Sequence, residues 1–223
     1  MLSMARLAAG LAAVIFGCAF LFAASSCAAP EHTYVANTAN RTYFKVPASW
    51  HEIDQSAFQQ TSSAASPTPQ SSGEWVVAYD AAQVPSPEHL FASNTLDPIV
   101  YVSVQPVPAE ATGQVSLDNL RDLMLPVTAD ARAAAKAAST SFSDFTLVSD
   151  SVLTPKSGLQ GIHEVFQYRV DGGLLQTFDQ TAYTNKEGSK VYLMLLRCSS
   201  TCYQARHAEL DSVTASFTIQ ERS

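Results

Sequence analysis

Basic side chains are scarce in this sequence and are spread thinly along it. The 223 residues hold 13 Lys and Arg against 20 Asp and Glu, which gives a formal net charge of −7. Proteins that bind nucleic acid or anionic lipid headgroups neutralise phosphates with clustered Lys and Arg. Since no such cluster occurs here, we expect neither nucleic acid nor an anionic headgroup surface among the partners.

The motifs of common catalytic and nucleotide-binding sites are also absent. The sequence has no GxSxG, SxxK or HExxH pattern and no glycine-rich phosphate loop. Glu164 and Asp179 fall on neighbouring predicted strands and could face each other as an acid–base pair, but we interpret both as solvated strand residues. The histidines stand apart, with no pair at a metal-ligand spacing: His32, His51, His89, His163 and His207. The sequence therefore predicts no enzyme, no catalytic residue, no metal and no cofactor.

An apolar stretch from Leu7 to Ala24 occupies the N-terminus and ends shortly before Cys27. Arg6 is the only charged residue ahead of it. One cation, an apolar run and small residues before a cysteine are typical of a bacterial lipoprotein signal. We expect cleavage before Cys27, fatty acylation of this cysteine (palmitate), and a lipid-anchored protein on the extracytoplasmic face of the cell membrane.

Two alternatives at the N-terminus stay open. The apolar run has 18 residues, close to the roughly 20 of a membrane-spanning helix, so an ordinary signal or an uncleaved anchor fits as well. The other alternative is modification at Cys18, which Phe16 next to the cut disfavours. Cys18 fits better as an apolar residue of the signal.

Removal of residues 1–26 leaves 197 residues. It takes Arg6 and leaves 12 basic against 20 acidic side chains, a net charge of −8. A chain of this length buries roughly 70% of its unfolded surface. We assign 27–40 to the lipidated cysteine and a flexible spacer, and 41–219 to one domain. The low-complexity segment 59–73 is expected to be a mobile loop, in which Thr61 and Thr68 are candidates for O-linked sugar.

Cys198 and Cys202 are the cysteines left once Cys18 and Cys27 are assigned to the signal and the lipid. Two cysteines in an oxidising compartment predict a disulfide, here closing a small loop. A redox-active pair is an alternative that lacks the CxxC spacing. A zinc site that adds His207 is another, and it lacks a fourth ligand.

Alternation of apolar and polar residues, with turn formers between the runs, predicts a mainly antiparallel sheet. Val191 to Leu196 is apolar on both faces, which predicts a central strand covered on both sides. The expected strands are 42–46, 74–79 and 98–105, followed by a four-stranded meander of 145–153, 161–170, 174–183 and 190–197.

Three helical segments are expected. Ser116 caps a helix with Leu117, Leu120 and Met124 on one face, Pro126 breaks it, and an alanine-rich helix restarts over 129–138. A last helix over 203–216 aligns an apolar face of Tyr203, His207, Leu210, Val213 and Phe217. The element order predicts an α+β fold with a sheet of about six or seven strands and helices packed on its faces.

Four aromatic residues on the early strands form the candidate binding surface. They are Tyr43, Trp50, Trp75 and Tyr79. Exposed together, they would make a platform for sugar, peptide or lipid. The alternative is that they pack in the core, since aromatic side chains bury large areas.

The strand end Tyr43-Phe44-Lys45-Val46-Pro47-Ala48-Ser49-Trp50 and the closing segment Leu210-Asp211-Ser212-Val213-Thr214-Ala215-Ser216-Phe217 carry a resemblance. Together with the element order between them, they resemble LpqN-type actinobacterial lipoproteins and the PsbP-like fold, over about 41–219. Ser49 stands where this pattern often has Gly. The resemblance implies the fold, the location and an accessory, protein-docking role, and it brings no catalytic residue.

We expect a non-enzymatic, lipid-anchored binding or scaffolding module of the cell envelope, with an envelope protein as partner. The alternative is a carrier of a lipid or cell-wall amphiphile in an apolar pocket between the sheet and the helical region 116–138. An enzyme is the third hypothesis. A closed core would exclude the carrier, whereas an apolar pocket of several hundred cubic ångströms would favour it.

Overall fold

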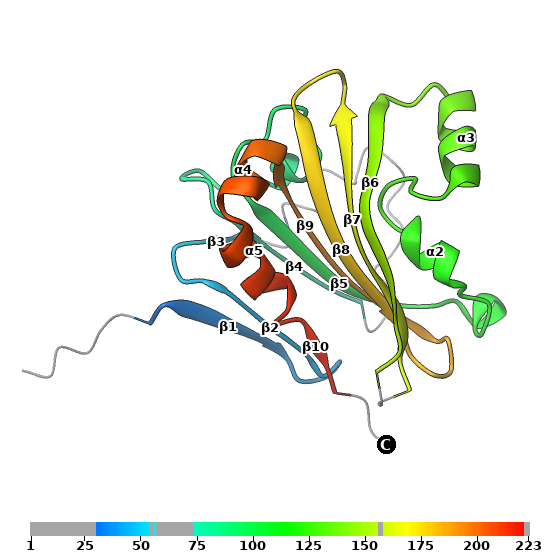
Figure 1. Ribbon diagram of the computed structural model, residues 1–223. Helices are drawn as coiled ribbons and strands as arrows, with labels where there is room; N and C mark the ends of the chain where they lie inside the picture. The colour runs from blue at the N-terminus through cyan, green and yellow to red at the C-terminus, as the bar shows by residue number, and fades with distance from the viewer. Residues whose placement is uncertain (1–29, 54–55, 57–73, 156–157, 221–223) are drawn as a thin grey trace, which may run out of the picture.

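The structure, a computed structural model, describes residues 30–53, 56, 74–155 and 158–220. Two antiparallel sheets and several short helices form it (Figure 1). The apolar N-terminal run, Cys27 and the segment 59–73 lie outside the described residues. None of the helices within the described part combines the length and the hydropathy that a membrane span requires.

The larger sheet has seven strands, and all neighbouring strands are antiparallel. The predicted meander is confirmed, and β9 is central, as its apolar composition indicates. The spatial order is β3 (His51–Ile53), β4 (Trp75–Asp80), β5 (Ile99–Pro106), β9 (Lys190–Ser199), β8 (Leu175–Thr184), β7 (Gln160–Val170) and β6 (Phe142–Leu153).

The smaller sheet joins the two ends of the described chain. β2 (Thr42–Pro47) lies between β1 (His32–Asn37) and β10 (Thr218–Ile219). β1 falls in the segment predicted as a spacer up to Asn40, so these six residues form a paired strand instead. Their polar composition hides the strand, because β1 is an edge strand and all six of its side chains are exposed or half-exposed.

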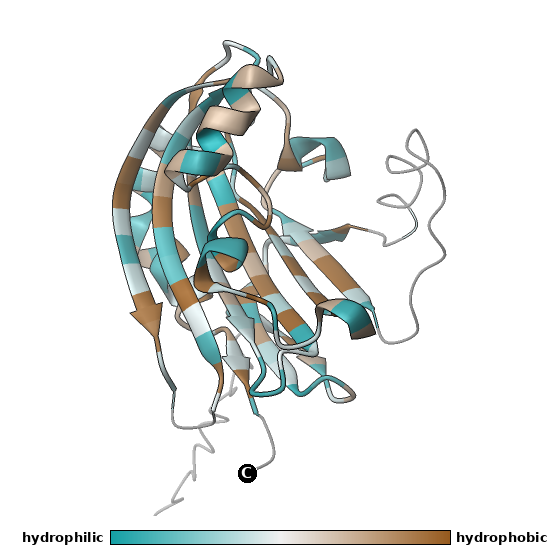
Figure 2. Cartoon of the chain, turned by 90° about the vertical axis from the view of Figure 1, so that its right-hand side faces the viewer, coloured by the Kyte–Doolittle hydropathy of each residue, from teal (hydrophilic) through white to brown (hydrophobic). Residues whose placement is uncertain are grey.

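Alternate residues of the central strands point to opposite faces of the larger sheet, and both faces are buried. Val100 and Val102 of β5 face one side, with Met194 and Leu196 of β9. The neighbouring positions face the other side, as Leu195 does. Figure 2 shows the alternation as bands of hydropathy along strands of a curved sheet. Each face therefore needs its own cover.

Short helices supply that cover. α4 (Ser200–Ala205), α5 (His207–Thr214) and the smaller sheet pack on the face of Met194. On the opposite face lie η1 (Pro87–Leu90), α2 (Leu117–Arg121) and the segment leading to α3 (Ala129–Ala137). η2 (Ala109–Ala111) lies in the connection between β5 and α2.

The helix boundaries follow local signals in two places and depart from them in a third. Ser116 caps α2 in a capping box with Asn119, and α3 begins only after Pro126, as predicted. The last helix, predicted as continuous, is interrupted at Arg206, whose backbone leaves the helical region (φ −112°, ψ 17°). His207, the first residue after the interruption, is exposed and lies 2.9 Å from Asp211, and its ring meets the Tyr203 ring edge to face at 5.7 Å.

Candidate functional site

The aromatic residues singled out from the sequence do not form an exposed platform. Trp50 and Tyr79 are 4% and 6% exposed and belong to the core under α5. The Trp50 indole donates to Glu209 and the Tyr79 hydroxyl to Glu52. Tyr43 and Trp75 are half-buried. The core interpretation therefore holds for Trp50 and Tyr79, and with these two buried the four side chains are not exposed together.

Glu164 and Asp179 do not form a pair, because they lie on opposite faces of the sheet. Glu164 is paired in register with Gln180, and Asp179 with Val165. Both carboxyl groups are buried, which corrects the expectation that they are solvated. Asp179 accepts hydrogen bonds from Tyr203 at 2.7 Å and contacts His163 at 2.9 Å.

Cys198 and Cys202 are neighbouring free thiols in the structure, not the disulfide that the sequence predicted. Cys198 lies near the end of β9 and Cys202 in α4, across the cap formed by Ser199. The Cys198 thiol donates to Cys202, and this hydrogen bond raises the pKa of Cys198 and lowers the pKa of Cys202. His207 takes no part, and within the described residues no three His, Cys, Asp or Glu gather as a metal site.

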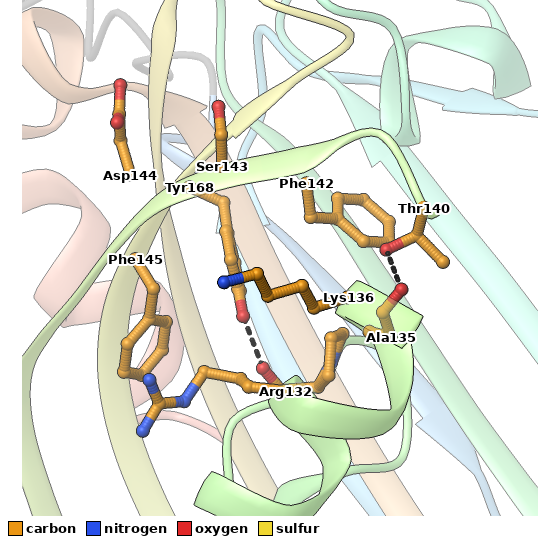
Figure 3. Close-up of a pocket in the computed structure, with 10 residues that line it drawn as sticks. Arg132, Ala135, Lys136, Thr140, Phe142, Ser143, Asp144, Phe145 and Tyr168 are labelled. Carbon is orange, nitrogen blue, oxygen red and sulfur yellow. Dashed lines mark hydrogen bonds between the residues drawn. The ribbon is translucent and has the colours of Figure 1, made fainter. Parts of the chain in front are cut away.

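A cavity of about 320 Å³ opens between α3 and the start of β6 (Figure 3). We call it the α3–β6 pocket. Its lining residues come from the loops before and after α3, from α3 itself, from β6 and from β7: Pro126, Arg132, Ala135, Lys136, Thr140, Phe142, Ser143, Asp144, Phe145 and Tyr168.

Three rings line the pocket. The Tyr168 ring lies 5.6 Å from that of Phe142 and 5.1 Å from that of Phe145, measured between centroids. The Tyr168 hydroxyl donates to the Pro126 carbonyl at 2.5 Å, which ties the ring to the loop before α3. Burial raises the pKa of Tyr168 to about 12, so the phenol stays neutral at physiological pH.

Two cations from α3 stand beside these rings. Arg132 and Lys136 are one helical turn apart and so share a face of the helix. The Arg132 guanidinium carbon lies 4.3 Å from the Phe145 ring centroid, and its Nε donates to the Val127 carbonyl at 3.2 Å. Figure 3 shows the Lys136 ammonium extended toward Tyr168.

The strand that forms the far wall is irregular. The register of β6 against β7 shifts between Ser143 and Thr146, and Asp144 there has a φ of 56°. Asp144 is paired with Arg169 of β7 at 2.7 Å. A bulge of this kind bends a strand and changes the direction of its side chains, and such bulges are common next to binding sites.

The sequence predicted, as an alternative, an apolar pocket between the sheet and the helical region 116–138. The α3–β6 pocket lies between α3 of this region and the sheet, and its lining combines rings with two cations. The signal that was present is the spacing of Arg132 and Lys136 in an alanine-rich helix. The rings opposite these cations lie on β6 and β7. No local sequence pattern shows that α3 packs beside these two strands.

The lining suits noncovalent binding of a small molecule. Rings offer faces for stacking, the cations attract negative charge, and Ser143 adds a hydroxyl. Pockets of this volume are at the lower end of those that hold small ligands.

No family model matches the sequence, and no curated protein matches it. Among solved structures, cyanobacterial PsbP from Synechocystis sp. PCC 6803 is similar over 90% of this chain and 99% of its own, with a TM-score of 0.53 at 13% identity. LpqN of Mycobacterium tuberculosis, described as involved in cell envelope biogenesis, is matched over 85% of this chain and 90% of its own, with a TM-score of 0.44 at 14% identity. The chain therefore has the PsbP-like α+β fold that its sequence predicts, and at these identities the likeness concerns the fold alone.

Proposed function

We propose that this chain is a non-enzymatic binding module of the cell envelope, anchored through a lipid on Cys27 at the extracytoplasmic face of the membrane. The observation that carries the proposal is the α3–β6 pocket, a cavity of about 320 Å³ with three rings and two cations in its lining. The location rests on the lipoprotein signal in the sequence.

The lining of the α3–β6 pocket contains both rings and cations, and this limits the kinds of ligand that a carrier could hold there. A long acyl chain placed in this pocket would strip water from Arg132 and Lys136 without compensating their charge, which is costly. The pocket therefore fits a small polar molecule or the head group of an amphiphile better than an acyl chain.

Docking of an envelope protein is the second function that the structure favours. Among the described strands β6 pairs with β7 alone, at the edge of the sheet, and it exposes Leu147, Val148 and Val152. Edge strands accept an extended segment of a partner by strand addition. A photo-crosslinking residue at Val148 should then capture an envelope protein, whereas the same residue at exposed Val84 should capture none.

Native mass spectrometry of the full-length protein, taken gently from its own membrane, tests the binding proposal. We expect an acylated chain with an additional noncovalent mass. Ala135→Trp fills the pocket from α3 and should abolish that mass, whereas Ala134→Trp on the exposed side of the same helix should retain it. An unliganded wild-type protein, or equal binding by both variants, would refute the pocket as the ligand site.

The anchor is tested separately with Cys27→Ala. We expect the variant to carry no fatty acyl group, and to accumulate unprocessed or to be released from the membrane. Acylation that persists in this variant would show that the lipid is attached elsewhere, with Cys18 as the first candidate.

A further inference from the structure

We propose that the ligand of the α3–β6 pocket is a small anion built on a ring, with its charge held by Lys136 and Arg132 and its ring stacked on the pocket's aromatic side chains. This inference rests on the proposed binding function and names the chemical class of the ligand.

Arg132 and Lys136 bring two positive charges to the pocket that no carboxylate of the described residues pairs with. Three arginines near the surface have carboxylate partners: Arg121 pairs with Asp118 and Asp150, Arg169 with Asp144, and Arg206 with Glu209. Within the described residues, neither Arg132 nor Lys136 is in an ion pair. Arg132 and Lys136 differ from the other cations without an ion pair in that they share one helix face and both line the pocket.

Asp144, the one acidic residue among the described lining residues, does not neutralise the charge of Arg132 and Lys136. Asp144 is already matched by Arg169, whose Nε lies 2.7 Å from its carboxylate. The Arg132 guanidinium uses its Nε on a backbone carbonyl and one face on Phe145, so its terminal nitrogens have no hydrogen-bond partner among the described residues. The pocket therefore keeps donors and positive charge for a ligand.

Aromatic side chains form the other part of the pocket lining. The half-buried Phe142 ring lines the cavity beside the Lys136 side chain, and it packs against the Tyr168 ring, which is 3% exposed (Figure 3). Ring faces bind flat or cyclic bodies, such as aryl groups and sugars, by stacking. The volume of about 320 Å³ suits one ring with one charged substituent.

A cationic or wholly apolar ligand fits less well. A cation would meet the like charges of Lys136 and Arg132, and an apolar ligand would desolvate them without a partner. An anion with a ring uses both parts of the lining.

Isothermal titration calorimetry of the full-length, acylated protein in detergent tests the inference with phenyl phosphate, phenol and inorganic phosphate as probes. Phenyl phosphate should bind, and phenol and inorganic phosphate should each bind at least about tenfold more weakly. Lys136→Gln and Arg132→Gln should each weaken phenyl phosphate binding about tenfold. Lys186→Gln, at an exposed lysine outside the pocket, should not change it.

The outcomes separate the inference from the function on which it rests. Equal affinity for phenol and phenyl phosphate would overturn the anionic class while leaving the pocket a binding site. Equal affinity for inorganic phosphate and phenyl phosphate would overturn the inference that the ligand contains a ring. No heat with phenyl phosphate would overturn the inference, and the Ala135→Trp comparison of bound mass then decides whether the pocket binds anything.

Discussion

Glu164 of β7 and Gln180 of β8 lie directly opposite each other in the buried layer beneath α2, and the Gln180 amide donates to Glu164 Oε1 at 3.0 Å. The same amide donates to the carbonyls of Leu120 and Arg121. Within the described residues, Glu164 Oε2 and Gln180 Oε1 have no hydrogen-bond partner. The pKa of Glu164 is raised to about 8. Burial is the main cause, and the negative charge of nearby Asp150 is the next.

The raised pKa of Glu164 predicts that the fold loses stability as the pH rises. Between the unfolded value of 4.5 and the folded value of about 8, the folded chain holds a proton that the unfolded chain has released. This carboxyl group should therefore lower the free energy of unfolding by about 1.4 kcal/mol per pH unit across that range, and add no further slope above it. Chemical denaturation at a series of pH values measures the slope.

Glu164→Gln should flatten this slope and be more stable than the wild type at pH 8, since it buries no charge. Glu110→Gln, at an exposed residue of η2, is the matched control and should keep the wild-type slope. A wild-type slope in Glu164→Gln would show that another group is responsible.

His163 should titrate above its ordinary pKa. Its hydrogen bond to the buried Asp179 carboxylate raises the pKa of His163, with Nε2 at 2.9 Å from Asp179 Oδ1. The stability from this pair should be complete below about pH 6.5 and disappear as the pH rises through the raised value. A titration of the His163 ring by NMR should place its midpoint above 6.5, and Tyr203→Phe, which removes another donor to Asp179, should not lower it. A midpoint at or below 6.5 would exclude the charged pair.

Arg197 should be essential for the position of the segment that contains η1. It is fully buried, and its Nη1 and Nη2 donate to the carbonyls of Leu90 and Ala92 at 2.6 and 2.7 Å. Arg197→Met leaves both carbonyls without these donors and should cost about 2–4 kcal/mol of unfolding free energy. Thermal unfolding measures the loss, and Lys186→Met at an exposed residue should cost less than about 0.5 kcal/mol. An unchanged melting temperature in Arg197→Met would contradict this role.

Cys202 should be the more reactive of the two thiols. The hydrogen bond from Cys198 and the charge of Arg206 lower its pKa, whereas the same hydrogen bond and burial raise the pKa of Cys198. In the reduced, folded protein, N-ethylmaleimide should modify Cys202 first, as read by peptide mass. Cys202→Ser should remove the fast phase, and Cys198→Ser should keep a reactive thiol. Faster labelling of Cys198 would show that the hydrogen bond is reversed.

Local patterns predicted much of the secondary structure because the signals themselves are local. The Ser116 cap, the break at Pro126 and the two-fold alternation of the meander act through neighbouring residues. β1 was missed because its polar composition reflects a position at the edge of the smaller sheet.

The faces of Glu164 and Asp179 depended on register. A hairpin centred on Gly172 pairs Glu164 with Gln180, which sends Asp179 to the opposite face. A slip of one strand against the other by one residue would pair Glu164 with Asp179 on one face, so composition alone could not decide it. The α3–β6 pocket depends on a contact between a helix and strands that no sequence spacing encodes.

Because β1 begins early in the chain, a lipid anchor at Cys27 would hold the folded domain close to the membrane. Only four residues lie between Cys27 and His32, where β1 begins, and even a fully extended chain of that length reaches about 18 Å. In a lipid-anchored copy the start of β1 would therefore lie within about two nanometres of the bilayer, which holds the domain next to the membrane surface. Its search for ligands would then be two-dimensional, with an effective concentration set by the area of the membrane.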